Sequence, residues 1–168
     1  AFVRLATAAG KYWVCKRAPA MVGECLESLG GAGYVEEAIL ARLYREAPLP
    51  SIWEGSGNVM TLDILRALAK APQTWEVCRQ LLHSVPEQPP SYRQTLATLD
   101  NLMVAPCESQ ARLLAEKLAL SLQARILLHK DPAVGEQFCQ ARLAPERGLQ
   151  YGSTTLDCKL LLSRIAPD

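Results

Sequence analysis

One carboxylate, Glu54, stands in a stretch of otherwise apolar, glycine or small polar residues, PSIWEGSGNVM at positions 50–60. A carboxylate that is shielded from water has a raised pKa, because burial disfavours its charged form, and it can then accept a proton near neutral pH. Glu54 could therefore be a base held in a dry pocket, with Ile52 and Trp53 as its walls. The structural alternative is a turn that ends one helix and begins the next.

A second glycine-bearing stretch, ESLGGAGYVEE at residues 27–37, precedes the first along the chain. Gly30 and Gly31 are suited to ending a helix, because glycine tolerates the backbone conformations that follow a last helical turn. The pattern is not a dinucleotide-binding fingerprint, since no strand–helix–strand unit surrounds it. Neither glycine stretch is specific by itself.

The histidines and cysteines do not show the spacing of metal ligands. His83 and His129 lie far from one another and from any pair of cysteines, so we predict no metal site. Cys15 and Cys25 fall on one predicted helix, where ten residues separate them by about 15 Å, too far for a disulfide. We expect reduced, buried thiols in a cytoplasmic protein at positions 15, 25, 78, 107, 139 and 158.

Apolar residues recur at helical spacing along the chain, and no segment shows the alternation of a strand. The sequence therefore predicts an all-α fold, a helical bundle in two blocks that the proline-rich linker SVPEQPPS (84–91) separates. The two predicted domains are residues 1–84 and residues 85–168. We expect helices over residues 2–29, 35–46, 58–71, 73–84, 91–104, 106–130, 132–143 and 153–165.

Several residues suggest how the helices of the first block begin and end. Pro19 is expected to kink or divide the first helix. Glu36 and Glu37 would fall in the first turn of the second helix, where the helix dipole favours acidic side chains. The two prolines within residues 47–51 predict an extended segment after that helix.

Helix starts are also predicted further along the chain. Ser56 and Asn58 can cap the helix that follows Glu54. Residues 91–94, Ser-Tyr-Arg-Gln, have the form of a capping box. Pro106 is expected at the first position of a helix, where proline is tolerated, and Asp131 is expected to be an N-cap.

Composition restricts the class of protein. The chain has 168 residues, 49% of them hydrophobic and 21% charged, which is typical of a globular domain. Its net charge is only +1, which argues against a strong overall field for nucleic acid or a membrane surface. No run of about 18 apolar residues and no secretory signal are present, so we expect no membrane association.

Three short motifs follow one another in a specific order: LGGAGY (29–34), RLYRE (42–46) and WEGSGN (53–58). This ordered set resembles the C-terminal helical domain of the acyl-CoA dehydrogenase flavoproteins. RLYRE and WEGSGN are most similar to the AidB subfamily, whose members are associated with the bacterial response to DNA alkylation. The resemblance extends over the whole chain, is strongest over residues 1–70 and is weak after residue 85.

By this resemblance, the chain is the C-terminal third of a protein that also has an N-terminal helical domain and a middle β-domain. The family uses FAD to oxidise an acyl-CoA thioester by α,β-dehydrogenation, and it assembles as homo-dimers or tetramers. The resemblance implies that Glu54 is the base that removes the α-proton, and that residues 85–168 are an AidB-type extension. We expect this chain alone to be inactive and to bind FAD weakly, because other walls of the pocket lie elsewhere.

The resemblance also assigns FAD contacts to both glycine stretches. The residues concerned are Gly30 and Gly31, whose contact is made across a subunit interface, and Ile52, Trp53, Gly55, Ser56, Gly57 and Asn58. One position departs from the family, because Glu27 replaces its glutamine. A carboxylate cannot donate the hydrogen bond of an amide and would repel a pyrophosphate, so we expect the contact beside Gly30 to be altered.

An alternative function follows from the same resemblance, namely non-specific binding of double-stranded DNA by the helical region. Such binding needs Lys and Arg side chains on one face, because phosphate contacts supply its affinity. Residues 74–168 contain ten basic and ten acidic side chains, so this half of the chain gives the alternative little support. The candidate residues are Arg66, Lys70, Arg112 and Arg125. Asp63 could pair with Arg66, three residues later on the same helix face, and so offset its charge.

Overall fold

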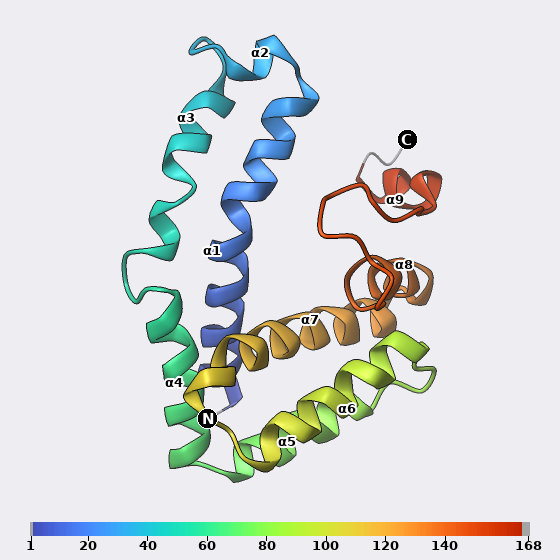
Figure 1. The fold of residues 1–168 in the computed structure, drawn as a ribbon. Helices are drawn as coiled ribbons and strands as arrows, with labels where there is room; N and C mark the ends of the chain where they lie inside the picture. Colours follow the sequence, from blue (N-terminus) through green and yellow to red (C-terminus); the bar gives the residue numbers. More distant parts are fainter. Residues whose placement is uncertain (1, 166–168) are drawn as a thin grey trace. The chain divides into compact units, whose positions relative to one another are not determined.

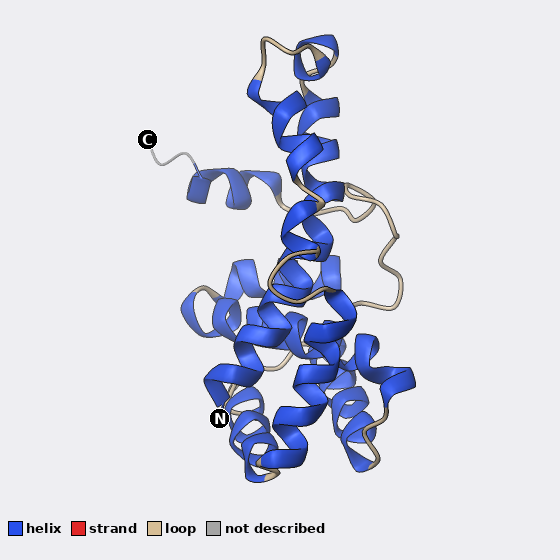
Figure 2. Ribbon diagram, turned by 90° about the vertical axis from the view of Figure 1, so that its left-hand side faces the viewer, coloured by secondary structure: helices blue, strands red, loops and turns tan. Residues whose placement is uncertain are grey.

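The computed structural model describes residues 2–165, and within them the regular structure is entirely helical, which confirms the predicted all-α fold (Figure 1, Figure 2). Among these residues, no helix is both long and apolar enough to cross a membrane. The helices are α1 (Phe2–Ser28), α2 (Gly31–Tyr34), α3 (Ile39–Glu46), α4 (Gly57–Lys70), α5 (Gln73–His83), α6 (Pro90–Val104), α7 (Ala111–Lys130), α8 (Pro132–Arg142) and α9 (Cys158–Ile165), with 3₁₀ turns at Leu49–Ser51 and Glu108–Gln110.

The chain forms two compact units, and neither is continuous in sequence. The first unit contains the residues up to Pro72 together with residues 106–116, and the second contains residues 73–105 together with those from Lys117 onward. The predicted division between residues 84 and 85 is of another kind, because it separates the domain that resembles the family from an extension and not one compact unit from another. It stays a prediction.

The first unit is built around α1. Helices α3 and α4 lie alongside it, and α2 makes the turn between α1 and α3 (Figure 1). Leu5 and Ala9 of α1 and Ile64 of α4 are completely buried, so apolar packing holds the N-terminal half of α1 against α4. Pro19 lies inside α1, which the structure describes as a single helix. The segment between α3 and α4, which contains Glu54, is therefore positioned beside α1 by helices on both of its sides.

The second unit consists of α5, α6, the greater part of α7, α8 and α9. Its core includes the completely buried side chains of Cys78, Tyr92 and Leu99. The buried hydroxyl of Tyr92 donates a hydrogen bond of 2.9 Å to the carbonyl oxygen of Leu82, which satisfies both polar groups. Asp131 caps α8 by accepting a hydrogen bond from the backbone N–H of Val134, as predicted.

Two predictions for the first unit are wrong. Helix α3 begins at Ile39, so Glu36 and Glu37 precede it instead of occupying its first turn. Glu36 instead forms an ion pair with Arg45, and both side chains are exposed. Residues 47–51 are not extended, because Pro48 adopts helical angles and Leu49–Ser51 form a 3₁₀ turn, which requires only the φ value that proline already has.

Helix starts in the rest of the chain also differ from the predictions. Residues 91–94 form no capping box, because α6 begins one residue earlier, at Pro90, and the Ser91 hydroxyl donates to the carbonyl of Cys139 instead. Pro106 does not begin a helix, since a 3₁₀ turn precedes α7 and this helix begins at Ala111. The last helix begins at residue 158 rather than 153.

All six cysteines are free thiols, as predicted, but they are not all buried. Cys78 and Cys139 are buried, whereas Cys25, Cys107 and Cys158 are exposed. The prediction of buried thiols is therefore wrong for these three, because each lies at a helix end or on a helix face that no neighbouring helix covers within its own unit.

Candidate functional site

The segment around Glu54 has an unusual backbone. Glu54 adopts a left-handed conformation with φ at 51°, and among the described residues it is the only one other than glycine with a positive φ. Gly55 follows with φ at 104°. This φ value requires glycine, whereas the atom that a Cβ would meet, the terminal methyl group of Met60, is the end of a flexible side chain that can move. Two consecutive residues with positive φ make a sharp local turn just before α4.

Lys11 of helix α1 forms hydrogen bonds with this segment. The ammonium group of Lys11 donates hydrogen bonds of 2.7 Å to the carbonyl oxygen of Trp53 and of 2.7 Å to that of Gly55. These are the carbonyls of the residues immediately before and after Glu54. Sequence reasoning missed this contact, because only the fold brings a residue of α1 to a segment more than forty positions later.

The described residues do not form a dry pocket around Glu54. Its side chain is exposed, and the two expected walls, Ile52 and Trp53, are 64% and 56% exposed. The carboxylate therefore lies on an open face of the first unit, next to apolar side chains that are available to pack against something else. Desolvation of Glu54 would have to come from atoms outside the described residues.

The N-terminus of α4 lies shortly after Glu54, and two basic side chains, Lys16 and Arg112, lie near it. Ser56 is its N-cap residue, as predicted, but its hydroxyl makes no capping hydrogen bond. Asn58 does not cap the helix, because its side-chain oxygen accepts a 2.8 Å hydrogen bond from Arg112. Gly57 is buried, and a Cβ atom there would lie 2.5 Å from the Cε atom of Lys16. Free backbone N–H groups and two nearby cations give this helix start the character of an anion site.

The glycine stretch at the end of α1 is a separate place in the fold. Gly30 has φ at 58° and is exposed, as is Gly31. Lys11 and Ser28 are separated by 17 residues of α1, which corresponds to about 25 Å along the helix axis. The structure therefore does not bring Gly30 and Gly31 together with the Glu54 segment. Within one chain, the Gly30–Gly31 turn and the Glu54 segment are therefore two separate candidate binding surfaces.

The third glycine of LGGAGY has a packing role that the sequence did not reveal. Gly33 is buried, and a Cβ atom at this position would lie 3.0 Å from the carbonyl carbon of Leu26 and closer still to its oxygen. Only glycine allows α2 to approach the last turns of α1 so closely. Gly33 therefore fixes the turn in which Gly30 and Gly31 are presented.

A hollow of about 580 Å³ lies next to this turn, between α1, α2 and α3. Its lining includes Tyr34 and Tyr44, and an ion pair closes one side, where Arg45 donates two hydrogen bonds of 2.6 Å and 3.0 Å to Glu36. The motif RLYRE thus contributes Tyr44 and Arg45 to the surroundings of the glycine turn. Glu27, which we expected to disturb a contact beside Gly30, is exposed.

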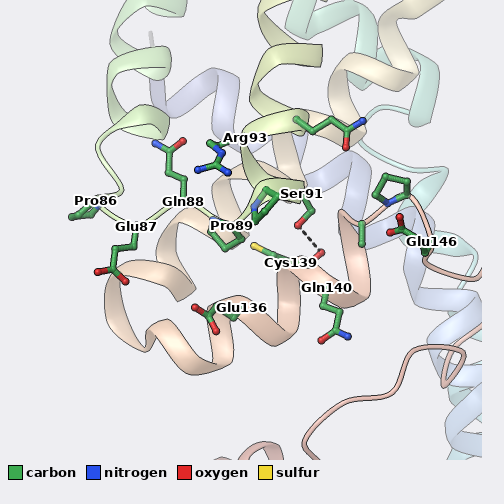
Figure 3. Close-up of a pocket in the computed structure, with 14 residues that line it drawn as sticks. Pro86, Glu87, Gln88, Pro89, Ser91, Arg93, Glu136, Cys139, Gln140 and Glu146 are labelled. Atoms are coloured by element: carbon green, nitrogen blue, oxygen red, sulfur yellow. Dashed lines mark hydrogen bonds between the residues drawn. The ribbon is translucent and has the colours of Figure 1, made fainter.

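A larger hollow of about 770 Å³ lies in the second unit, between the linker before α6 and the end of α8 (Figure 3). Its rim has the charged side chains of Glu87, Arg93, Glu136 and Glu146, and its wall includes several prolines of the linker. No residue that the sequence predicted for catalysis, cofactor binding or DNA binding lines it.

The four residues predicted to bind DNA do not form one surface within a compact unit. Arg66, Lys70 and Arg112 belong to the first unit and are exposed, whereas Arg125 belongs to the second. Arg125 is half-buried, and among the described residues its buried Nε atom has no hydrogen-bond partner.

Asp63, the possible partner of Arg66, interacts with the charge of Arg66 but forms its ion pair with another arginine. Asp63 pairs with Arg4 of α1, whose guanidinium donates to both carboxylate oxygens, one of them at 3.1 Å. This hydrogen-bonded guanidinium lowers the pKa of Asp63, and the nearby charges of Arg66 and Lys70 lower it further. A partner from another helix thus replaced the expected neighbour, because α1 and α4 pack side by side. Within residues 2–165, no three His, Cys, Asp or Glu side chains are arranged to hold a metal ion.

Comparisons with known proteins support one family. Residues 2–69 match the family model described as "Acyl-CoA dehydrogenase, C-terminal domain". The chain is 37% identical over 150 residues to "Putative acyl-CoA dehydrogenase AidB" of Escherichia coli (strain K12), an alignment that covers 89% of this chain and 28% of that protein. It is 43% identical over 67 residues to "Acyl-CoA dehydrogenase family member 11" of Caenorhabditis elegans, which covers 40% of this chain and 11% of that protein.

A solved structure is similar as well. The structure titled "Bd2924 apo-form" superposes with a TM-score of 0.65 at 33% sequence identity, over 77% of this chain and 25% of that one. The chain thus spans 28% or less of the length of each of these three proteins. The family-model match includes both glycine stretches and the Glu54 segment.

Proposed function

Because the chain belongs to the acyl-CoA dehydrogenase family through its C-terminal helical domain, we propose that it is part of an AidB-like, FAD-dependent enzyme for α,β-dehydrogenation of an acyl-CoA thioester. The observation that carries this proposal is the backbone of Glu54. A left-handed carboxylate residue, held in place by the fold and directed to an open face, is the arrangement expected of a group that acts on a bound substrate rather than of an ordinary turn.

In the proposed reaction, Glu54 accepts the α-proton of the thioester. The backbone N–H of Glu54 is suited to donate a hydrogen bond to the thioester carbonyl, where negative charge develops as the proton leaves. FAD, when bound, would accept the β-hydrogen as a hydride. The apolar side chains of Ile52 and Trp53 would exclude water from this place once the remainder of the active site covers them, which would raise the pKa of the carboxylate.

The start of α4 fits the anionic part of FAD. Ser56, Gly57 and Asn58 present backbone N–H groups that α4 itself cannot satisfy, and Lys16 and Arg112 add positive charge beside them. We therefore assign the FAD contacts of this segment to the backbone of residues 55–58 and not to the side chain of Asn58, whose oxygen is occupied by Arg112.

Gly30 and Gly31 are assigned a second FAD contact, made in a neighbouring subunit of a homo-dimer or tetramer. Their distance from the Glu54 segment along α1 agrees with two cofactor molecules rather than one. Exposed apolar side chains on α1 to α3, such as those of Met21, Tyr34 and Ile39, also suit burial in an assembly. The carboxylate of Glu27, on the last turns of α1, weakens this contact by repelling the pyrophosphate.

The proposal is tested with the full-length protein that contains this chain. Glu54→Gln keeps the size and hydrogen-bonding ability of the side chain but removes its basicity. We expect the variant to retain FAD, seen by its visible absorption, and to lose at least about a hundredfold in kcat when a panel of acyl-CoA thioesters is assayed with an artificial electron acceptor. Loss of the flavin would instead mean that Glu54 is structural. Absence of turnover by the unsubstituted protein across the panel would contradict the dehydrogenase proposal.

The DNA-binding alternative is not favoured by a specific observation. Two of its three residues in the first unit, Arg66 and Lys70, lie near the carboxylate of Asp63, and Arg112 is engaged with Asn58. This function, together with a cytoplasmic location and a role in the response to DNA alkylation, stays a prediction from the resemblance.

A further inference from the structure

Lys11 is placed to control the conformation of Glu54 although it lies on another helix. Its ammonium group bonds to the carbonyl oxygens of Trp53 and Gly55, both at 2.7 Å, and these two carbonyls belong to the residues on either side of Glu54. Both contacts lie within the first compact unit. Neither the family match nor the sequence motifs single out this lysine.

The two carbonyls converge on one point because of the positive φ values of Glu54 and Gly55. In an extended strand, the carbonyls of residues i and i+2 point in the same direction but stay far apart, whereas a tight turn brings them together. A residue such as glutamate reaches the left-handed region only at an energetic cost, so other contacts must hold it there. Within the described residues, Lys11 supplies two charge-assisted hydrogen bonds that require this turn.

The contact of Lys11 with two carbonyls differs from a typical lysine contact at a protein surface. A lysine ammonium is strongly hydrated and its long side chain loses rotamer freedom when fixed, so a single exposed acceptor would give little net stabilisation. Here two carbonyls are bridged at equal, short distances, and one of the two hydrogen bonds is partly buried. The side chain comes from the part of α1 whose neighbouring residues, Ala9 and Tyr12, are buried, so its base is rigidly positioned.

We propose that Lys11 is a positioning residue for Glu54: its ammonium group locks the two peptide carbonyls that flank Glu54 and thereby holds this residue in its left-handed conformation. The lock itself follows from the geometry alone, whereas its consequence for catalysis rests on the proposed function. Lys11 does not touch the substrate. It fixes the direction of the Glu54 carboxylate and of the Glu54 N–H before any substrate arrives.

The lock is tested first on this chain, without flavin or substrate. Lys11→Met removes the ammonium group and keeps a chain of similar length, and Lys11→Arg retains a cation able to donate to both carbonyls. Lys16→Met is the matched control, because it removes the same charge from the same helix but does not change the two carbonyl contacts. A protease that cleaves after glutamate then reports how often the segment opens, because such a protease binds extended chain and cannot bind the Glu54–Gly55 bond while the turn is locked.

We expect Lys11→Met to accelerate cleavage after Glu54 by about tenfold, the factor for losing two hydrogen bonds of ordinary net strength. Cleavage after Glu24, which lies inside α1 of the same unit, should keep its rate and serves as the internal reference, because it needs a wider unfolding of that unit. Lys11→Arg should restore most of the protection and Lys16→Met should change neither rate. An unchanged rate after Glu54, or equal acceleration at both glutamates, would overturn the lock, since the second result means general destabilisation.

The catalytic consequence is tested separately, in the full-length flavoprotein. If Lys11 orients the base, Lys11→Met should lower kcat by about tenfold or more while KM changes less than twofold, and Lys11→Arg should recover part of the loss. A rise in KM with unchanged kcat would overturn the positioning role. Failure of the Glu54→Gln test with a normal lock in the protease assay would refute the proposed function alone, so the two failures are distinguishable.

Discussion

The third glycine of LGGAGY offers the sharpest structural prediction, because its neighbour Gly31 is a matched control. A Cβ atom at Gly33 would lie 3.0 Å from the carbonyl carbon and 3.1 Å from the Cα atom of Leu26, and still closer to the carbonyl oxygen. These are backbone atoms, which cannot rotate away as a side chain can. At Gly31, in the same short helix, nothing lies within 4 Å of a Cβ atom, and the φ value is not one that disfavours alanine.

The magnitude follows from two opposing terms. Overpacking of a well-packed contact costs about 1–3 kcal/mol, and the upper end applies where backbone must move. Alanine in place of glycine in a helix returns about 0.5–1 kcal/mol through its smaller loss of conformational entropy. We therefore expect Gly33→Ala to lower the free energy of unfolding by about 2 kcal/mol. Gly31→Ala should leave it unchanged or raise it by a few tenths of a kcal/mol.

The assay is urea unfolding of both variants followed by tryptophan fluorescence. The substitution Trp75→Phe in all proteins removes the signal of the second unit and leaves Trp13 and Trp53 to report on the first. Equal unfolding midpoints for Gly31→Ala and Gly33→Ala would refute the reasoning. They would mean that α2 can move away from α1 at no cost, and that the turn presenting Gly30 is not fixed by the close approach at Gly33.

Two further predictions concern ionisable side chains. Because the Arg4 guanidinium holds the pKa of Asp63 below its usual value, their pairing stabilises the fold above the unfolded-state pKa of Asp63, and this stabilisation is lost as the pH falls through the lower folded-state pKa. Asp63→Asn should therefore lower the free energy of unfolding by up to about 1 kcal/mol at pH 7 and leave it unchanged near pH 2. Urea unfolding midpoints at both pH values measure this difference. Burial raises the pKa of Cys78 and of Cys139 to about 12, whereas hydrogen bonding with Ser109 and Gln110 lowers that of exposed Cys107. At pH 8, iodoacetamide should therefore label Cys107 rapidly and the two buried thiols only after unfolding, which mass spectrometry of the native protein can follow. Early modification of Cys78 or Cys139 would contradict this prediction.

The sequence determined the fold class and the location of most helices, because the recurrence of apolar residues at a period near 3.6 can be read directly from the order of the residues. It also determined the family, since three short motifs in a fixed order are specific even where each alone is not. Local caps were predictable where the partner is a near neighbour, as with Asp131 and the N–H of Val134.

Predictions that depended on a choice between local and distant partners were wrong. Ser91 was expected to cap its own helix and instead bonds to Cys139, and Asp63 could pair within α4 and instead pairs with Arg4. Helix α6 begins before Ser91, so this residue is not in the capping position, and the carboxylate of Asp63 is hydrogen-bonded by Arg4 of α1. A helix packed from elsewhere in the chain offered a better-placed partner, and no short-range rule contains that information.

The Glu54 segment combines both kinds of information. The sequence alone singled out the Glu54 carboxylate and shows a glycine directly after it. Glycine is needed at position 55 because this residue adopts a φ that other residues rarely reach. Only the tertiary structure decided that Glu54 itself is left-handed and that Lys11 bridges the carbonyls on both sides. The physical reason is that a hydrogen bond between residues more than forty positions apart exists only after the packing of α1 against α4 has brought them together, and that packing is a property of the whole unit rather than of either motif.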